Sequence, residues 1–246
     1  KATVAFSEAA AALGANIKTG HDVKELSQQQ DGSWQVISSQ GEFKAKTLAL
    51  AVGAWSRLVG DMLGIDIPIT PIRGQMWATE PVPPSIFHLI GSMESAFDWS
   101  SQLSSNSHPR EITHHGDTRI TRHLYGGQSR NGEIIFGGDR QSVGYDYSQN
   151  AEGIEVNRGQ ASEVIPLMAK LPISRTWSGM MPFSMDGKPI IGKVPGFKNL
   201  FILTGLASSG FGRGPMAGKL LANYIHTSHP ALVLAESDPA RCITFK

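Results

Sequence analysis

The segment LFILTGLASSGFGRGPMAGKLLANYI, residues 200–225, decides the fold of this chain. Its first residues, LFILTG, form an apolar run that predicts a buried strand, and a cluster of glycines follows. The last residues, KLLANYI, predict a helix. A strand, a glycine turn and a helix form the layout that holds a dinucleotide phosphate, because backbone N–H groups at a helix start attract negative charge.

A dinucleotide-phosphate site is only one interpretation of this segment, and it fits poorly. A Rossmann fingerprint needs GxGxxG and then a second strand that ends in an acid. Gly210, Gly212 and Gly214 give GxGxG instead, Pro215 follows, and no second strand comes after the helix. Two interpretations remain open. One is a close helix–sheet crossing that needs small residues; the other is a helix start that approaches a flat, electron-rich ligand such as a reduced isoalloxazine ring.

The composition is that of an ordinary globular chain. Its 246 residues are 40% hydrophobic and 17% charged, with a formal net charge of +1. A net charge this small does not indicate binding to nucleic acid or to a charged membrane surface. No apolar run is long enough to form a membrane-spanning helix. The single cysteine, Cys242, excludes a disulfide framework. No secretory signal is visible, so we expect a cytoplasmic protein, or one of an organelle lumen if a targeting segment precedes the chain.

The pattern along the chain predicts the order of elements. Residues 2–13 predict a helix that stops at Gly14, and residues 56–64 predict a short helix with Ser56 as its N-cap. The other predicted elements are strands at 33–38, 43–52 and 72–79, a hairpin of 118–125 and 133–138 around SRNG, an exposed serine-rich loop at 97–108, and a helix at 153–170. In this order, a helix and an antiparallel meander come first, an antiparallel middle region follows, and a strand, a glycine cluster and a helix end the chain. The order predicts two interleaved units.

Three ordered motifs resemble the D-amino-acid-oxidase superfamily of flavoproteins, which includes glycine oxidase, sarcosine oxidase and D-amino-acid dehydrogenases. The last segment is similar to the family's G-x-S-G-H-G-F-x-x-x-P-x-x-G, with matches at Gly205, Gly210, Phe211, Pro215 and Gly218. RTWSGMMPFSMDGKPIIG is similar to W-x-G-x-x-P-x-x-x-D-G-x-P-x-I-G, with matches at Trp177, Gly179, Pro182, Asp186, Gly187, Pro189 and Gly192. LALAVGAWS and PIRGQ resemble A-x-G-A-W-S…P-x-R-G-Q, with matches at Ala51, Gly53, Ala54, Trp55, Ser56, Pro71, Arg73, Gly74 and Gln75.

The chain departs from the family pattern at several positions. It lacks the family's opening strand, GxGxxG loop and ribose-binding acid, so we expect a fragment or truncated form that alone binds FAD weakly or not at all. Ser209 replaces the histidine of GHGF. Gly179 stands near the position where sarcosine oxidases carry a flavin-bonding cysteine, so non-covalent FAD is expected. Met181 replaces an arginine that holds the substrate carboxylate in some members, which leaves Arg73 and Arg213 as alternative anchors.

The resemblance implies an α/β fold in which a partial Rossmann-like FAD-binding domain is interleaved with an antiparallel-sheet substrate domain. The expected boundaries are residues 1–72 and 175–246 for the FAD-binding domain and residues 73–174 for the substrate domain. The implied activity is FAD-dependent oxidation of a C–N bond in an amine or amino acid by hydride transfer to flavin N5, followed by hydrolysis of the imine. Oxygen or a quinone would accept the electrons.

The resemblance also assigns residues. The implied cofactor-binding residues are Val23 on the adenine side, Ala51, Gly53, Trp55, Gly179, Gly205, Ser209, Gly210, Phe211, Gly212 and Arg213. The candidate catalytic residues are Arg73 and Arg213, and no metal is expected. Two rival functions stay open: flavin oxidation of a hydroxy acid or a glycerophosphate, and a truncated, non-catalytic chain.

Several other residues have ordinary alternatives beside their functional interpretations. His114 and His115 with Asp117 suggest a metal site, but adjacent residues of a strand point to opposite faces. Asp186 fits a turn better than a catalytic base. The aromatic residues that could line a pocket or fill the core are Trp55, Trp99, Tyr125 and Trp177.

Overall fold

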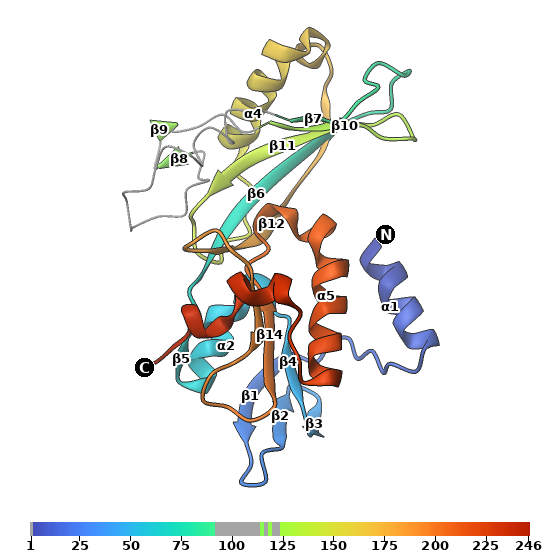
Figure 1. The fold of residues 1–246 in the computed structure, drawn as a ribbon. Helices are drawn as coiled ribbons and strands as arrows, with labels where there is room; N and C mark the ends of the chain where they lie inside the picture. Colours follow the sequence, from blue (N-terminus) through green and yellow to red (C-terminus); the bar gives the residue numbers. More distant parts are fainter. Residues whose placement is uncertain (1, 92–113, 116–117, 120–123) are drawn as a thin grey trace. The chain divides into compact units, whose positions relative to one another are not determined.

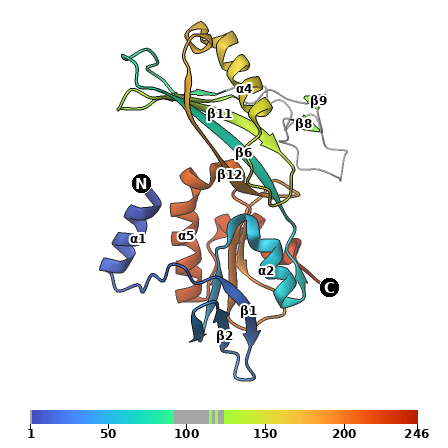
Figure 2. The same ribbon diagram turned by 180° about the vertical axis from the view of Figure 1, so that it is seen from behind.

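The structure, a computed structural model, describes residues 2–91, 114–115, 118–119 and 124–246 (Figure 1 and Figure 2). It divides into two compact units: residues 1–48 with 196–200, and residues 49–195 with 201–246. The expected domain boundaries at residues 72/73 and 174/175 stay a prediction. The predicted serine-rich loop at 97–108, Trp99 and Asp117 lie outside the described residues.

The first unit combines one helix with a small antiparallel meander. Helix α1 (Ala2–Ala12) is followed by Gly14 at a φ of 96°, which confirms the predicted helix and its glycine stop. Strands β1 (Val23–Gln28), β2 (Trp34–Ser38) and β3 (Gly41–Ala45) form an antiparallel sheet in that order. Trp34 is fully buried, and its Nε1 donates a hydrogen bond to Lys198 O at 3.0 Å. The segment 196–200 therefore completes this unit.

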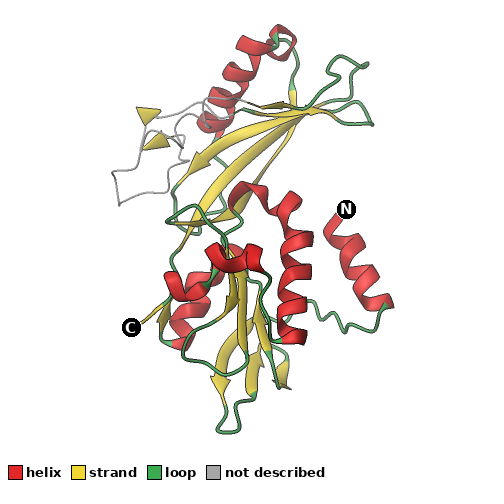
Figure 3. Cartoon of the chain, viewed as in Figure 1, coloured by secondary structure: helices red, strands yellow, loops and turns green. Residues whose placement is uncertain are grey.

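A five-stranded antiparallel sheet dominates the second unit (Figure 3). In spatial order its strands are β12 (Ile173–Ser184), β6 (Ile69–Thr79), β11 (Ile134–Gln141), β10 (Tyr125–Gln128) and β7 (Ile90–Gly91). Strand β6 is longer than predicted because it continues through Pro71, which lies opposite Pro182. The sheet tolerates Pro71 because the pairing with β11 ends at Arg73, so β6 has β12 alone beside it there. A hairpin around SRNG is present as β10 and β11, and β11 overlaps the predicted second strand. The predicted first strand at 118–125 is wrong, because β10 begins at Tyr125 and Thr118–Arg119 pairs with His114–His115 instead.

One face of this sheet is buried under helix α4 (Ala151–Val164) and the short helix η2 (Pro166–Ala169). Trp77 on β6 donates from Nε1 to Asn157 Oδ1 of α4 at 2.9 Å. Its ring belongs to a buried cluster with Phe136 and Ile154. Helix α4 is shorter than predicted because Pro166 cannot continue it.

The opposite face, which we call the open face, carries a different set of side chains. Residues directly opposed in register share a face, and side chains alternate along each strand. The register therefore places two rows of opposed residues on the open face, each row running across neighbouring strands. One row consists of Tyr125, Gly137, Met76 and Trp177, and the next consists of Arg140, Gly74 and Gly179.

A three-stranded sheet and helix α5 (Gly210–Thr227) form the other part of this unit. The strands lie in the order β13 (Ile190–Lys193), β14 (Leu200–Thr204) and β4 (Leu48–Leu50). Helix α5 packs on this sheet through Ala217 and Leu221, in a cluster that includes Phe201. The prediction of one strand at 43–52 is wrong. The chain forms β3 and then β4 in a different sheet, because the alternating pattern gives way to a continuous apolar run.

Short elements close the second unit. Helix α2 (Ser56–Leu63) follows η1 (Gly53–Trp55) and ends at Gly64, with a φ of 68° as the glycine stop predicts. After α5, the chain forms η4 (Leu232–Ser237), η5 (Pro239–Arg241) and β15 (Thr244–Phe245), which pairs with β5 (Ile65–Asp66). Strands β8 (His114–His115) and β9 (Thr118–Arg119) pair with each other.

Asp186 occupies a turn, as predicted. Its Oδ1 accepts a hydrogen bond from Lys188 N at 3.0 Å, and its carboxylate pairs with Arg241 of η5 at 2.8 and 3.2 Å. Burial acts to raise the pKa of Asp186, but the hydrogen bonds from Arg241 and Lys188 together outweigh it and lower that pKa. Asp186 therefore ties the C-terminal segment to the turn after β12.

Gly126 in β10 has no room for a side chain, which gives a test of the sheet packing. A Cβ there would lie 2.2 Å from Ile135 O and 2.4 Å from Phe136 Cδ1. Gly126→Ala should therefore lower the free energy of unfolding in urea by about 1–3 kcal/mol. Gly91→Ala in the adjacent β7 is the control, since a Cβ there meets none of the described residues within 4 Å. Equal losses in the two variants would contradict this packing.

Candidate active site

A buried pair of hydroxyl groups joins the start of α2 to the last residue of β14. Ser56 Oγ lies 2.7 Å from Thr204 Oγ1, and both residues are almost fully buried. Both hydroxyls also lie within hydrogen-bonding distance of Gly53 O, at 2.6 and 3.1 Å. Ser56 was expected to cap α2, but Trp55 occupies the N-cap position and the Ser56 hydroxyl contacts Gly53 and Thr204 instead. The pair therefore holds η1 beside the end of β14.

The turn after β14 lies at Gly205, earlier in the chain than the glycine cluster suggested. Gly205 has a φ of 73° and is buried, and a Cβ there would lie 3.3 Å from Ile190 N. Ala207 also has a positive φ, of 49°, in the short helix η3 (Ala207–Ser209). Gly210, Gly212 and Gly214 belong to α5 itself. The layout with these glycines in the turn is therefore wrong, whereas the alternative interpretation of a glycine-rich helix start agrees with the structure.

The start of α5 exposes backbone without a side-chain cap. Ser209 occupies the N-cap position, but its Oγ donates to Leu206 O at 3.0 Å and does not cap the helix. In the part of the chain that the structure describes, a Cβ at Gly212 or Gly214 would meet nothing within 4 Å, and Phe211 is 85% exposed. The first N–H groups of a helix lack intrahelical partners and carry partial positive charge. This helix start can therefore receive an electron-rich ligand.

The start of α5 borders the open face of the large sheet (Figure 1). Ala207 of η3 packs against a small cluster that contains Ile72 of β6 and Met181 and Phe183 of β12. Met181 and Phe183 lie on the open face, because they alternate in step with Gly179. The glycine-rich helix start and the open face therefore face the same region.

Arg73 points to the other side of the sheet. Its side chain is 4% exposed, and its Nη1 lies 3.2 Å from Asp146 Oδ2 and donates to Ser148 O. Its Nη2 donates to Gln141 Oε1, and its Nε has no partner among the described residues. Hydrogen bonds from Ser148, with a smaller contribution from Arg73, lower the pKa of Asp146. Arg73 thus holds the loop between β11 and α4.

Further contacts fix the same loop, residues 142–150. Asn150 N donates to Gln75 Oε1 at 2.6 Å, and Ser178 Oγ donates to Tyr147 O at 2.7 Å. Tyr147 also stacks on Trp55, with ring centroids 6.0 Å apart and an interplanar angle of 17°. Both rings are nearly half exposed, so Trp55 is not a core residue. The loop therefore links the large sheet to η1.

The structure brings together part of the predicted site. In the second unit, Ala51 is exposed just before η1, Gly179 is exposed on β12, and Arg213 is exposed on α5 without a described hydrogen-bond or ion-pair partner. Gly53 of η1 contacts Thr204 at the end of β14, and Trp55 lies in the same short helix. From Thr204 the chain continues through Gly205 and η3, which contains Ser209, into Gly210, Phe211 and Gly212 at the start of α5. Val23 begins β1 in the first unit.

Two residues of the open face, Met76 and Arg140, were not among the predicted site residues. Met76 lies two positions after Gly74 on the same strand, so the alternation within RGQM could have placed it there. Arg140 is 6% exposed, and its guanidinium carbon lies 5.8 Å from the centroid of the Phe183 ring. No sequence signal marks Arg140, because its face depends on the irregular pairing between Gly137 and Asp139.

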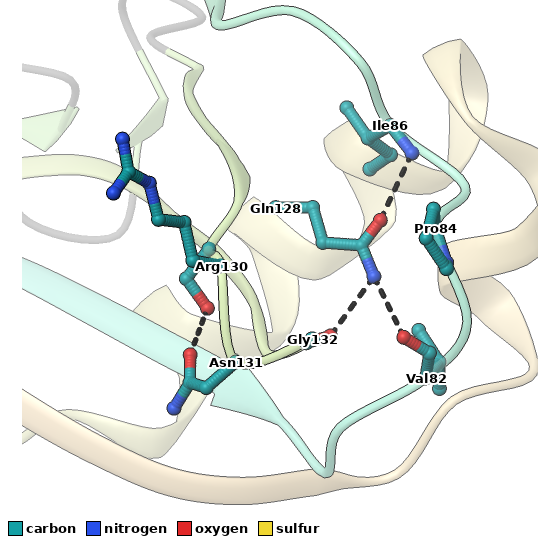
Figure 4. Close-up of a pocket in the computed structure, with 8 residues that line it drawn as sticks. Val82, Pro84, Ile86, Gln128, Arg130, Asn131 and Gly132 are labelled. Atoms are coloured by element: carbon teal, nitrogen blue, oxygen red, sulfur yellow. Dashed lines mark hydrogen bonds between the residues drawn. The ribbon is translucent and has the colours of Figure 1, made fainter.

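A cavity of about 370 Å³ lies elsewhere, at the tip of the β10–β11 hairpin (Figure 4). The Gln128 amide spans its wall: Nε2 donates to Val82 O at 2.9 Å and to Gly132 O at 3.0 Å. Its Oε1 accepts from Ile86 N at 3.1 Å. This cavity lies at the opposite end of β11 from Arg140, so it is separate from the candidate site.

The fold and the site define an α/β protein whose antiparallel sheet borders a bare, glycine-rich helix start. Residues 1–224 match the family described as FAD dependent oxidoreductase, and the chain belongs to that family. This match confirms the predicted family, fold class and cofactor, FAD. Within the described residues, every helix is too short or too polar to cross a lipid bilayer.

Several known proteins are similar to this chain. Glycine oxidase of Pseudomonas aeruginosa is 29% identical over 205 residues, which cover 83% of this chain and 48% of the relative. Mitochondrial dimethylglycine dehydrogenase of Mus musculus is 27% identical over 248 residues, 97% of this chain and 27% of the relative. The structure of L-proline dehydrogenase from P. horikoshii matches with a TM-score of 0.80 and 26% identity over 98% of this chain and 58% of that chain. The chain thus spans about half, or less, of these curated relatives.

The residues at the start of α5 fit the flavin of FAD. The negative edge of an isoalloxazine ring needs N–H donors and a close backbone approach, and the uncapped, glycine-rich helix start offers both. Cys242 lies next to η5, where burial raises the pKa of its thiol.

Proposed function

We propose that the protein oxidises a carbon–nitrogen bond of an amine or amino acid. The observation that carries the proposal is the start of α5, which has no side-chain cap and exposes Arg213 in its first turn. The helix start would hold the flavin, and the guanidinium would hold a substrate carboxylate beside it. Family membership supports this function, as do relatives named glycine oxidase and dimethylglycine dehydrogenase.

Each residue of the site would have a separate task. The N–H groups of Gly210, Phe211 and Gly212 would hold the electron-rich edge of the flavin. Arg213 would pair with both oxygens of the substrate carboxylate. The remaining proposed cofactor contacts are Val23, Ala51, Gly53, Trp55, Gly179, Gly205 and Ser209.

Bound FAD would supply the redox chemistry, accepting a hydride at N5 from the carbon next to nitrogen, and water would then hydrolyse the imine product. The chain's own residues orient the substrate for this step and keep it beside the helix start. Oxygen or a quinone would take up the electrons. In this proposal Arg73 does not touch substrate, because its guanidinium is occupied by the loop 142–150.

Product analysis tests the proposed function. The protein expressed from its complete gene and loaded with FAD would be incubated with amino acids, N-alkyl amino acids, hydroxy acids and glycerol phosphate. We expect a carbonyl product with an equal amount of ammonia or free amine from the nitrogen compounds alone. Turnover of a hydroxy acid or glycerol phosphate without any amine turnover would replace this function with the first rival. No turnover of any compound by FAD-loaded protein would favour a non-catalytic chain.

A further inference from the structure

The open face has a distinct order of side chains along β12. Met181 lies at the end of this order toward η3, because Met181 and Ala207 of η3 pack against the same cluster of Ile72 and Phe183. Gly179 follows two residues away, and Trp177 two residues beyond that on the same face. At about 3.4 Å per residue, Gly179 lies about 7 Å and Trp177 about 14 Å along the strand from Met181.

The middle residue of this order, Gly179, leaves the surface of the sheet without a side chain. Gly179 lies opposite Gly74 on β6, and a Cβ at Gly179 would meet no atom of the described residues within 4 Å. Two glycines side by side on neighbouring strands leave the sheet backbone open to a ligand. A small reacting group could therefore lie flat on the sheet between the start of α5 and Trp177.

The row beyond the glycines is apolar and aromatic. Trp177 lies opposite Met76, Met76 opposite Gly137, and Gly137 opposite Tyr125. Met76 lies over Gly137, since a Cβ built there would come within 2.1 Å of the Met76 sulfur. Tyr125 is 51% exposed, and Met76 and Trp177 are half-buried, so the row presents apolar surface.

Trp177 is held in place by a neighbouring cation. The Arg175 guanidinium carbon lies 4.6 Å from the centroid of a Trp177 ring, and Arg175 Nε pairs with Glu133 Oε1 at 2.9 Å. A guanidinium over an indole face stabilises the stacked arrangement. The Trp177 side chain therefore has a fixed orientation, whereas the flexible thioether of Met76 can adapt to ligands of different shape.

We propose that Met76, Trp177 and Tyr125 form a specificity surface for an apolar substituent of the substrate. This inference rests on the proposed function. The reacting carbon and nitrogen lie over Gly74 and Gly179, and a substituent that extends along β12 contacts Met76 and Trp177. The favoured substrates are amino acids with an apolar side chain or apolar N-substituent of several carbon atoms, and glycine is a poor substrate.

A substrate series tests this preference. The FAD-loaded protein from the complete gene would be assayed with glycine, sarcosine, both enantiomers of leucine, proline and N-benzylglycine. We expect kcat/KM for the best apolar substrate to exceed that for glycine at least about 10-fold, since each buried methylene contributes a factor of that order. A preference for leucine places the substituent on the α-carbon, and a preference for N-benzylglycine places it on nitrogen; each supports the surface.

Two variants and a matched control assign the preference to the open face. Met76→Ala and Trp177→Ala should each lower kcat/KM for the apolar substrate about 10-fold or more, and leave kcat/KM for glycine within about twofold. Met180→Ala is the control. Met180 is also half-buried, but it lies opposite Arg73 on the other face of the sheet, so both substrates should be unaffected. If Trp177→Ala does not fold, Met76→Ala still gives the result.

A binding measurement separates recognition from chemistry. Carboxylic acids that are not oxidised would be titrated while the flavin absorption spectrum is recorded. A cyclohexyl carboxylate should bind about 10-fold more tightly than acetate, and Met76→Ala should remove most of that difference. If amines reduce the flavin but glycine equals the apolar substrates, the specificity surface is wrong and the proposed function stands. If no amine reduces the flavin, the proposed function itself fails.

Discussion

Replacing Arg73 with methionine is expected to lower the free energy of unfolding by about 2–4 kcal/mol. The Arg73 side chain is 4% exposed and donates hydrogen bonds to Ser148 O and Gln141 Oε1, besides its pairing with Asp146. Methionine has a similar length but no donor, so these acceptors would lose their buried partner. The loop 142–150 would become less ordered, and the stacking of Tyr147 on Trp55 would be weakened.

Urea denaturation of the Arg73→Met variant measures this loss, and Arg213→Met is the matched control. Arg213 is exposed and has no described hydrogen-bond or ion-pair partner, so its replacement should change the free energy of unfolding by less than about 0.5 kcal/mol. If Arg73→Met were as stable as the unmodified protein and raised only KM, Arg73 would be a substrate anchor and its proposed positioning role would be wrong.

Replacing Arg213 with methionine is expected to lower kcat/KM for a carboxylate-bearing substrate about 10- to 100-fold. A hydrogen bond between charged groups contributes about 1.5–3 kcal/mol, and every 1.4 kcal/mol is a factor of ten. The same amine without its carboxylate should be oxidised equally well by both proteins. Steady-state kinetics on the two substrates measures the difference, and Arg213→Lys should show an intermediate loss because lysine cannot pair with both oxygens.

The kinetic comparison also separates the two roles proposed for Arg213. If it anchors the substrate, the variant keeps its FAD and loses activity on the carboxylate substrate alone. An equal loss on both substrates, with flavin released on gel filtration, would show that Arg213 binds the cofactor and not the substrate. The anchor would then have to be another cation near the open face.

The regular elements could be predicted where a local pattern decides the structure. The alanine-rich run before Gly14 forms a helix, and the alternating residues 34–38 form a strand, as their patterns indicate. The glycine cluster of α5 was compatible with both a turn and a helix start, because glycine propensity alone favours a turn. The chain turns instead at Gly205, where φ is 73° and a Cβ would lie 3.3 Å from Ile190 N.

The side of the sheet on which a residue lies was harder to predict. Arg73 and Gly74 are adjacent in the PIRGQ motif, yet one contacts the loop 142–150 and the other lies on the open face. A shift of one residue in register would exchange their roles. That register depends on the pairing of β6 with β12, about a hundred residues away in sequence, and no local signal encodes it.

The most direct test of the central claim is anaerobic mixing of the FAD-loaded protein, expressed from its complete gene, with amino acids. Loss of the long-wavelength flavin absorption band would be followed, with the same compounds carrying deuterium at the carbon next to nitrogen. We expect the band to be lost with amino acids and not with hydroxy acids or glycerol phosphate, and we expect deuterium to slow the loss. An oxidised spectrum that persists with every amine and amino acid would show that the protein does not oxidise a carbon–nitrogen bond.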